Sequence, residues 1–158
     1  MKEEPIKKFF VSVLVVVAVL SFIPFPNISQ KDITISQGQT EKPIPLFIGQ
    51  VTVKALIADT GPLRQRGLGG RDGILSDEAM FFVFDNSALH GIWMKDMMFP
   101  IDIFWVDETM RVISIKEGVS PSSYPEVFTP ISPAKYVLET GAGFAERNQV
   151  KIGDEISF

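Results

Sequence analysis

Asp102 is the residue whose surroundings say most about possible chemistry. It interrupts the apolar run Pro100–Val106, and strand alternation places it on the same face as Phe104 and Val106. Because an unpaired buried carboxylate costs several kcal/mol or shifts its pKa upward, Asp102 lies at a wet strand end or has a partner. Two interpretations stay open: a structural acid held by loop amides or by an arginine, and a catalytic acid.

Arginines beside a glycine-rich turn offer an anion site or a partner for that carboxylate. Arg64, Arg66 and Arg71 flank Gly67–Gly70, and a guanidinium binds carboxylates and phosphates through two parallel hydrogen bonds. We expect Arg64 or Arg71 to pair with Asp102, and solvated arginines around a turn are the alternative. The stretch matches neither G-x-G-x-x-G nor a P-loop, so we expect no cofactor.

The single histidine, His90, alternates with Ile92 and Met94 along an apolar face. A histidine in such a place is either a satisfied core or rim residue, or a general base beside Asp102 or Asp96. No G-x-S-x-G elbow is present, so the sequence offers no serine-hydrolase signature.

Further candidates surround the segment Trp93–Pro100, which is dense in large apolar groups. These side chains fill the core or, if exposed, form a binding patch that also carries Lys95 and Asp96. Glu139 is a second carboxylate within an apolar strand pattern, and it would form a glycosidase-like acid pair with Asp102 if the two lay close. The candidate ligand-binding or polar cluster comprises Arg64, Arg71, His90, Trp93, Lys95, Asp96, Asp102 and Glu139.

The elements that must position these residues are mostly β-strands. Short apolar runs separated by Gly and Pro turns predict an all-β, mainly antiparallel domain, a compact sandwich or barrel. Four prolines in 118–133 predict a long irregular loop rather than a central strand. Short helical turns are expected at 62–68 and 144–148. The expected strands span residues 44–48, 51–58, 80–84, 89–94, 101–106, 111–116, 136–140 and 155–158.

Composition excludes several kinds of chemistry. The 158 residues carry 15 Lys and Arg against 19 Asp and Glu, so we expect no nucleic-acid partner, because phosphate binding needs a basic surface. The absence of cysteine excludes disulfides and cysteine-ligated metals, and one histidine gives no ligand set for zinc, so we expect no metal. Hydrophobic residues make up 46% of the chain, which is enough for a packed core.

The N-terminal end predicts a membrane connection. Residues Phe9–Phe25 carry no charge and as a helix would reach about 26 Å, close to the hydrocarbon thickness of a bilayer. Lys2, Lys7 and Lys8 precede this run, which predicts a cytoplasmic N-terminus and an exported remainder. A cleaved signal peptide with a secreted product is the alternative. We expect an anchor over 1–25, a polar linker over 26–42 and an exported β domain over 43–158.

Six short blocks follow one another along the chain: Arg64-x-x-Gly67-Leu68, Met80–Phe84, His90–Lys95, Pro100–Ile103, Tyr136–Glu139 and Ile152–Asp154. Together they resemble the family called domain of unknown function 192, over about residues 44–158. The resemblance implies a compact β-sandwich with short helices in bacteria and archaea, often behind a signal peptide or anchor, and no established activity. This sequence departs from the family at Gly69, where Met is usual, and at Asp96-Met97, where Asn-Thr is usual.

Three functions follow from these patterns. The first is a membrane-anchored exported domain that binds a ligand or partner at the cell envelope, where the loops of 90–102 meet those of 64–71. The second is a small envelope hydrolase that uses Asp102, His90 or Glu139. The third is a passive structural or assembly module without a small-molecule site. A pocket with convergent polar groups favours the first two over the third.

Overall fold

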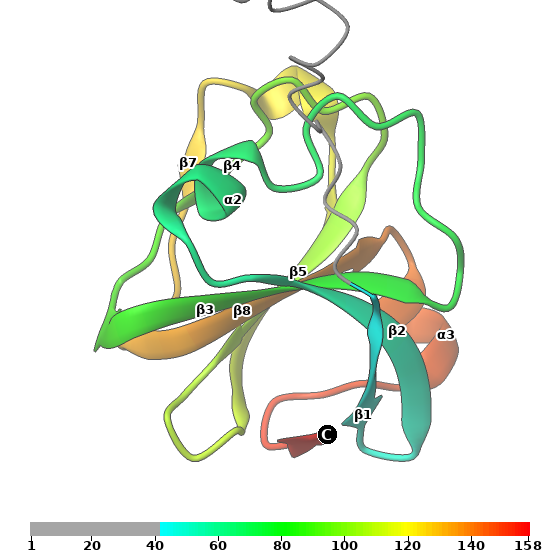
Figure 1. Cartoon of the computed structure of the whole chain (residues 1–158), viewed down its shortest axis with the longest axis vertical. Coiled ribbons are helices and arrows are strands. Elements are labelled where there is room, and N and C mark those ends of the chain that lie inside the picture. Colours follow the sequence, from blue (N-terminus) through cyan, green and yellow to red (C-terminus); the bar gives the residue numbers. More distant parts are fainter. Residues whose placement is uncertain (1–41) are drawn as a thin grey trace, which may run out of the picture. The chain divides into compact units, whose positions relative to one another are not determined.

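Seven strands form one strongly curled, mixed sheet in the computed structural model, which describes residues 42–158 (Figure 1). The strand order is β6-β5-β8-β3-β2-β1-β9, and a separate two-stranded sheet pairs β4 with β7. With two short helices and one 3-10 turn, the domain is mainly β, as the sequence predicts. The elements are β1 (Ile44–Ile48), β2 (Val51–Ala58), α2 (Gly61–Arg66), β3 (Glu78–Ala88), β4 (Ile92–Trp93), β5 (Ile101–Val106), β6 (Val112–Val119), η1 (Pro121–Ser123), β7 (Val127–Phe128), β8 (Ala134–Gly141), α3 (Phe144–Asn148) and β9 (Ile156–Ser157).

Strands β2 and β3 pair in parallel, an arrangement that the sequence pattern does not predict. Lys54 lies opposite Glu78, and Ala58 lies opposite Phe82. A parallel pair needs a long crossover connection, which residues 59–77 supply with α2 near their start. The other strand pairs of the described domain are antiparallel. The domain is therefore mainly antiparallel, as predicted, but its principal sheet is a mixed half-barrel.

Backbone hydrogen bonds join the two edges of the sheet at one end. The amide of Ile156 donates to the carbonyl of Met110 at 2.8 Å, and the amide of Val112 donates to Asp154 at 2.9 Å. Strand β9 also pairs with β1. The start of β6 and the segment around β9 thus lie together, which gives the sheet its half-barrel curl.

The sheet is covered on both faces, so the domain has two apolar cores. Alternation along β3 and β5 sends Phe81 and Phe104 into the curl, where α3 covers them, and sends Phe82 and Trp105 to the outer face. The continuous apolar run at 80–84 is the signature of a strand covered on both faces, and the structure confirms it.

The outer core lies under a layer made of α2, β4, β7 and their loops (Figure 1). The strand predicted over 89–94 is reduced to Ile92–Trp93, because β4 pairs only with the two-residue strand β7. Prolines at 125 and 130 flank β7 and offer no backbone donor, which limits its length. Gly118 and Val119 are the last residues of β6, and apart from η1 and β7 the remainder of 118–133 is irregular, as predicted.

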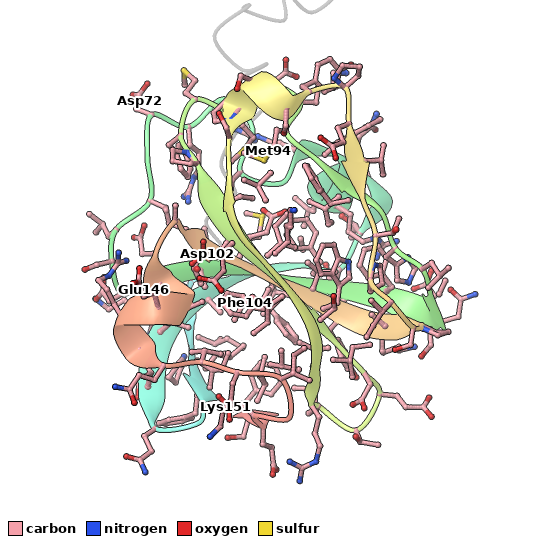
Figure 2. All side chains as sticks on the ribbon, turned by 180° about the vertical axis from the view of Figure 1, so that it is seen from behind. Asp72, Met94, Asp102, Phe104, Glu146 and Lys151 are labelled. Atoms are coloured by element: carbon pink, nitrogen blue, oxygen red, sulfur yellow. The ribbon has the colours of Figure 1, made fainter. Side chains whose placement is uncertain are left out.

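Asp102 joins three parts of the fold. Its side chain is completely buried, and its Oδ1 accepts a hydrogen bond from the amide of Gly118 at 2.8 Å. Its Oδ2 accepts a hydrogen bond from the amide of Ala145 in the first turn of α3 at 3.0 Å. Figure 2 shows Asp102 beside α3. One carboxylate therefore holds β5, β6 and α3 together.

Both amides need this acceptor for local reasons. The pairing of β5 with β6 shifts register between Ile101 and Ile103, and Gly118 lies in the resulting bulge with φ of +61°. The helix α3 begins after Gly143, which has no side chain to cap it, and Asp102 supplies the missing acceptor.

These contacts match the interpretation of Asp102 as a structural acid held by loop amides. The expected ion pair with Arg64 or Arg71 is wrong, since within residues 42–158 no salt bridge reaches Asp102. The physical reason is direction: Asp102 points into the curl, whereas Arg64 binds carbonyl groups on the outer side of the sheet.

We predict that Asp102→Asn lowers the free energy of unfolding by about 2–3 kcal/mol, because an amide nitrogen would then face a backbone N–H and leave a buried donor without a partner. Urea denaturation of the purified variant measures this loss. The same substitution at the exposed Asp96 is the control and should change stability by less than about 0.5 kcal/mol.

The double variant Asp102→Asn/Arg64→Gln separates the amide contacts from the expected ion pair. Because the two side chains share no contact, the two losses should add. A coupling free energy above about 1 kcal/mol would indicate an ion pair between Asp102 and Arg64 and contradict this account.

Candidate functional site

A pocket of about 360 Å³ lies on the outer side of the sheet, between α2, β3, β4 and β8. Its walls are apolar and largely aromatic, and they are formed by Leu68, Phe82, Phe84, Ile92, Trp93 and Met97. Four ionisable side chains also line it, Arg64, Arg66, Lys95 and Glu139, together with Gln65, Gly67 and Gly91. Small-molecule sites usually have this composition, an apolar body with a few convergent polar groups.

Strand register places Glu139 at the pocket. In β8 it pairs with Met80 of β3 and with Ile103 of β5, and both of these residues belong to the outer core. Only 5% of its surface is exposed. Gly67 lies above it, and an added Cβ there would lie 4.0 Å from Oε2 of Glu139 and 3.4 Å from the ring of Phe82. A larger residue there would narrow the pocket above the carboxyl group.

Burial dominates the electrostatics of Glu139. Removal from water raises the pKa of its carboxyl group to about 8. Among residues 42–158, no hydrogen bond or ion pair of this carboxyl group is formed. At neutral pH Glu139 is therefore mostly a neutral acid, able to donate one hydrogen bond into the pocket.

The three cationic side chains of the pocket differ in their contacts. Arg64 donates to the carbonyl groups of Asp59 at 2.6 Å and Val83 at 2.7 Å, which ties α2 to β3, and it lies 5.3 Å from the ring centroid of Phe84. Arg66 and Lys95 are exposed. Neither forms an ion pair within the described domain.

The turn that follows Arg66, the last residue of α2, meets the loop that carries Lys95. The amide of Gly70 donates to the carbonyl of Asp96 at 2.9 Å. A Cβ at Gly69 would lie 2.9 Å from the carbonyl oxygen of Arg66 and 3.3 Å from that of Lys95. The close approach therefore requires glycine at 69 and holds Arg66 and Lys95 on adjoining loops.

His90 lies behind the pocket rather than in it. Its ring stacks on Phe84 with centroids 3.6 Å apart, and its Nε2 is 2.9 Å from the carbonyl oxygen of Asn86. Its own carbonyl accepts a hydrogen bond from the indole of Trp105. The structure brings neither Asp102 nor Asp96 to this imidazole, so the rim interpretation holds and the general-base interpretation is wrong.

The acid pair of Asp102 and Glu139, which the sequence leaves open, is not formed. Thr140 lies opposite Asp102, and Ile103 lies opposite Glu139. Successive residues of a strand point to opposite faces, so Asp102 faces the inner core and Glu139 faces the outer pocket. No single active site can contain both carboxyl groups.

Four of the eight predicted site residues line the pocket, namely Arg64, Trp93, Lys95 and Glu139. Asp102, His90, Arg71 and Asp96 do not. Arg66, Phe82, Phe84 and Met97 also line it, although the sequence patterns assigned the two phenylalanines only to a strand. Their role becomes visible only once α2 folds over β3, and alternation alone carries no signal of it.

Residues 45–158 match the model of the family DUF192, described as "Uncharacterized ACR". The chain belongs to the DUF192 family. Two archaeal relatives named UPF0127 proteins are each 32% identical to it: TK1120 of Thermococcus kodakarensis over 107 residues, 66% of this chain, and one from Thermococcus gammatolerans over 104 residues, 65% of this chain. The match spans 64% of the length of each relative.

Two solved structures share the fold of this DUF192 domain, each at 24% identity and a TM-score of 0.70. One is a protein of unknown function from Novosphingobium aromaticivorans, of which 85% is covered by 73% of this chain. The other, a candidate transcription regulator from Sinorhizobium meliloti, is covered over 97% by 76% of this chain. At this identity the likeness concerns the fold alone.

Two sequence-based expectations concern metals and the membrane. Within the described DUF192 domain no group of three or more His, Asp and Glu side chains is placed to hold a metal ion. No helix among residues 42–158 is long and apolar enough to cross a bilayer. The predicted anchor at 1–25 and nearly all of the linker lie outside the described residues.

We predict that the stability of the domain falls as pH rises from about 4.5 to about 8 through Glu139. The unfolded carboxyl group ionises near its usual value of 4.5 and the folded one near 8, so the unfolded state loses its proton first and is favoured in between. Glu139→Gln removes this fall and should exceed the parent by roughly 2–4 kcal/mol above the folded pKa.

Urea denaturation across this pH range measures the effect. The matched control is Glu108→Gln, at an exposed turn, which should leave the pH profile parallel to that of the parent. If Glu139→Gln and the parent also had parallel profiles, the carboxyl group would not be desolvated.

Proposed function

We propose that this DUF192 domain binds a small ligand in the pocket around Glu139. The observation that carries the proposal is a carboxyl group with 5% exposure at an apolar pocket, with no partner among the described residues. No fully buried side-chain nitrogen or oxygen of the described domain lacks a partner, so the Glu139 oxygens keep a small surface at the pocket, open to a ligand. A nearly buried carboxyl group loses most of its hydration, and a fold that only needed packing would place an apolar residue there. A ligand that accepts a hydrogen bond from the Glu139 carboxyl group offsets this cost.

The volume and the lining of the pocket support a small ligand. A volume near 360 Å³ is at the lower end of the range for small-molecule sites. Trp93 is 45% exposed, and its indole forms an edge contact with Tyr124 at 6.4 Å. Aromatic side chains bury much area at little conformational cost, so Trp93 supports binding of a flat or apolar group.

A small hydrolase is the second candidate function. A carboxyl group with a pKa near neutrality suits a general acid, and Glu139 is such a group. The other ionisable residues that line the pocket are Arg64, Arg66 and Lys95, which supply neither a second carboxylate nor an activated nucleophile. Ligand binding therefore has better support than catalysis.

We further propose that the pocket faces the outside of the cytoplasmic membrane. The support is the uncharged run Phe9–Phe25, which Lys2, Lys7 and Lys8 precede closely, whereas the next basic residue after it is Lys31. Residues 1–25 would anchor the protein and 26–42 would tether the domain, and signal cleavage with secretion is the alternative. The envelope ligand or partner would then reach the pocket without crossing the membrane.

We predict that a screen of sugars, peptidoglycan fragments, nucleotides, small organic acids and metal ions contains a compound that raises the melting temperature of the full-length chain in mild detergent. A ligand that binds only the folded state stabilises it by mass action. The increment should vanish in Trp93→Ala and persist in Ile152→Ala, a control at another exposed apolar residue. Increments that persist in Trp93→Ala would leave the pocket without a role and favour a passive module.

We also predict that protease added to intact spheroplasts digests the domain. An anchor oriented by its N-terminal lysines leaves residues 43–158 outside the membrane. Immunoblotting with an antibody against the domain follows its loss, and a cytoplasmic protein that stays intact is the control. Protection of the domain until lysis would reverse the proposed orientation.

A further inference from the structure

We infer that the ligand of this pocket is an organic anion, with its charged group at Arg66 and Lys95 and its apolar body against Phe82 and Trp93. The inference rests on the proposed function and names the class of molecule that the site selects. Charge, placement of the cations and the state of Glu139 carry it, each by a separate observation.

The lining of the pocket has a charge opposite to that of the domain around it. Residues 42–158 hold 11 Lys and Arg against 15 Asp and Glu. The pocket holds three of those cations and a single acid, Glu139, which burial keeps mostly neutral at neutral pH. Concentrating one sign of charge at a hollow with low-dielectric walls attracts ligands of the other sign.

Two of the three cations are available to a ligand. Arg64 already donates to two backbone carbonyl groups and is 20% exposed, so it serves mainly to hold α2 on β3. Arg66 and Lys95 are exposed and form no ion pair within residues 42–158. Both residues line the same pocket, and the close approach at Gly69 brings the backbone of Arg66 next to that of Lys95. The proposal places one anionic group between these two side chains.

Glu139 then recognises the opposite end of the ligand. Its neutral carboxyl group donates a hydrogen bond, so it fits an ether, carbonyl or hydroxyl oxygen. A cationic ligand drawn to Glu139 and to the face of Trp93 is the competing choice. Such a ligand would face three like charges and a carboxyl group that is largely uncharged at neutral pH, so an anion is favoured.

Three probes with one shared body test this inference. They are para-methoxyphenylacetate, its uncharged amide, and para-methoxyphenethylamine, which differ chiefly in the charge at one end. Isothermal titration calorimetry on the full-length chain, at about pH 7 and low salt, measures each affinity and needs no signal from Trp93. We expect the acid to bind at least tenfold more tightly than the amide, and the amine to show no saturable binding.

Charge-removing variants locate the anionic group. Arg66→Gln and Lys95→Gln should each lower the affinity for the acid several-fold and leave the affinity for the amide unchanged. Lys151→Gln is the matched control, because Lys151 lies at the opposite end of the domain from α2 and β4 (Figures 1 and 2). Raising the pH above 8 should lower the affinity of the parent for the acid probe, because Glu139 then ionises. The affinity of Glu139→Gln should not change in this way. The charged groups that share the pocket with Glu139 are Arg64, Arg66 and Lys95.

The outcomes separate this inference from the proposed function. If the amide or the amine binds as tightly as the acid and Trp93→Ala abolishes that binding, the pocket binds ligands and the choice of an anion is wrong. Equal loss of acid and amide binding in Arg66→Gln and Lys95→Gln also overturns it. If no probe binds, the anion inference fails, and an empty compound screen would remove the proposed function as well.

Discussion

The two hydrogen bonds that Asp102 accepts from backbone amides are the constraint on which the rest of the fold depends. They fix the bulge of β6 at Gly118 and the first turn of α3 at Ala145 to the centre of β5. The bulge bends the sheet, and α3 covers the concave side, so a single buried charge determines where the inner core lies. The outer faces of β3 and β8 are then left for α2 and β4 to cover, and that cover contains the pocket.

The two buried carboxyl groups of the domain show how strand geometry assigns opposite tasks to similar residues. Asp102 and Glu139 lie on paired strands, and their registers differ by one residue. One faces inward and finds two amide donors, whereas the other faces outward and finds none among the described residues. A buried carboxyl group that accepts hydrogen bonds from amides stabilises the fold, whereas one without hydrogen-bond donors lowers its stability. Proteins typically retain such a loss of stability at functional sites.

Sequence patterns predict many of the strands. Alternation indicates Val51–Ala58, whose two faces pack differently, and the continuous apolar run at 101–106 indicates β5, which is buried on both faces. Prolines exclude a central strand from 118–133. The parallel pairing of β2 with β3 is not predictable in this way, because it depends on how the distant segment of α2 packs. The amides that hold Asp102 are equally unpredictable, because backbone amides carry no sequence signature. The nearby arginines are the only partners that the sequence offers by type, and the expectation of an ion pair follows from them. Glu139 could be proposed as a buried acid, but its separation from Asp102 required the register.

The way the half-barrel closes has a consequence for when the chain can fold. Strand β1 pairs with β9, and the carbonyl of Met110 receives the amide of Ile156, so the first and last strands of the domain are neighbours. Contacts between segments so far apart in sequence form late and slow the search for the native state. The inner core therefore cannot close during synthesis until residue 156 has left the ribosome.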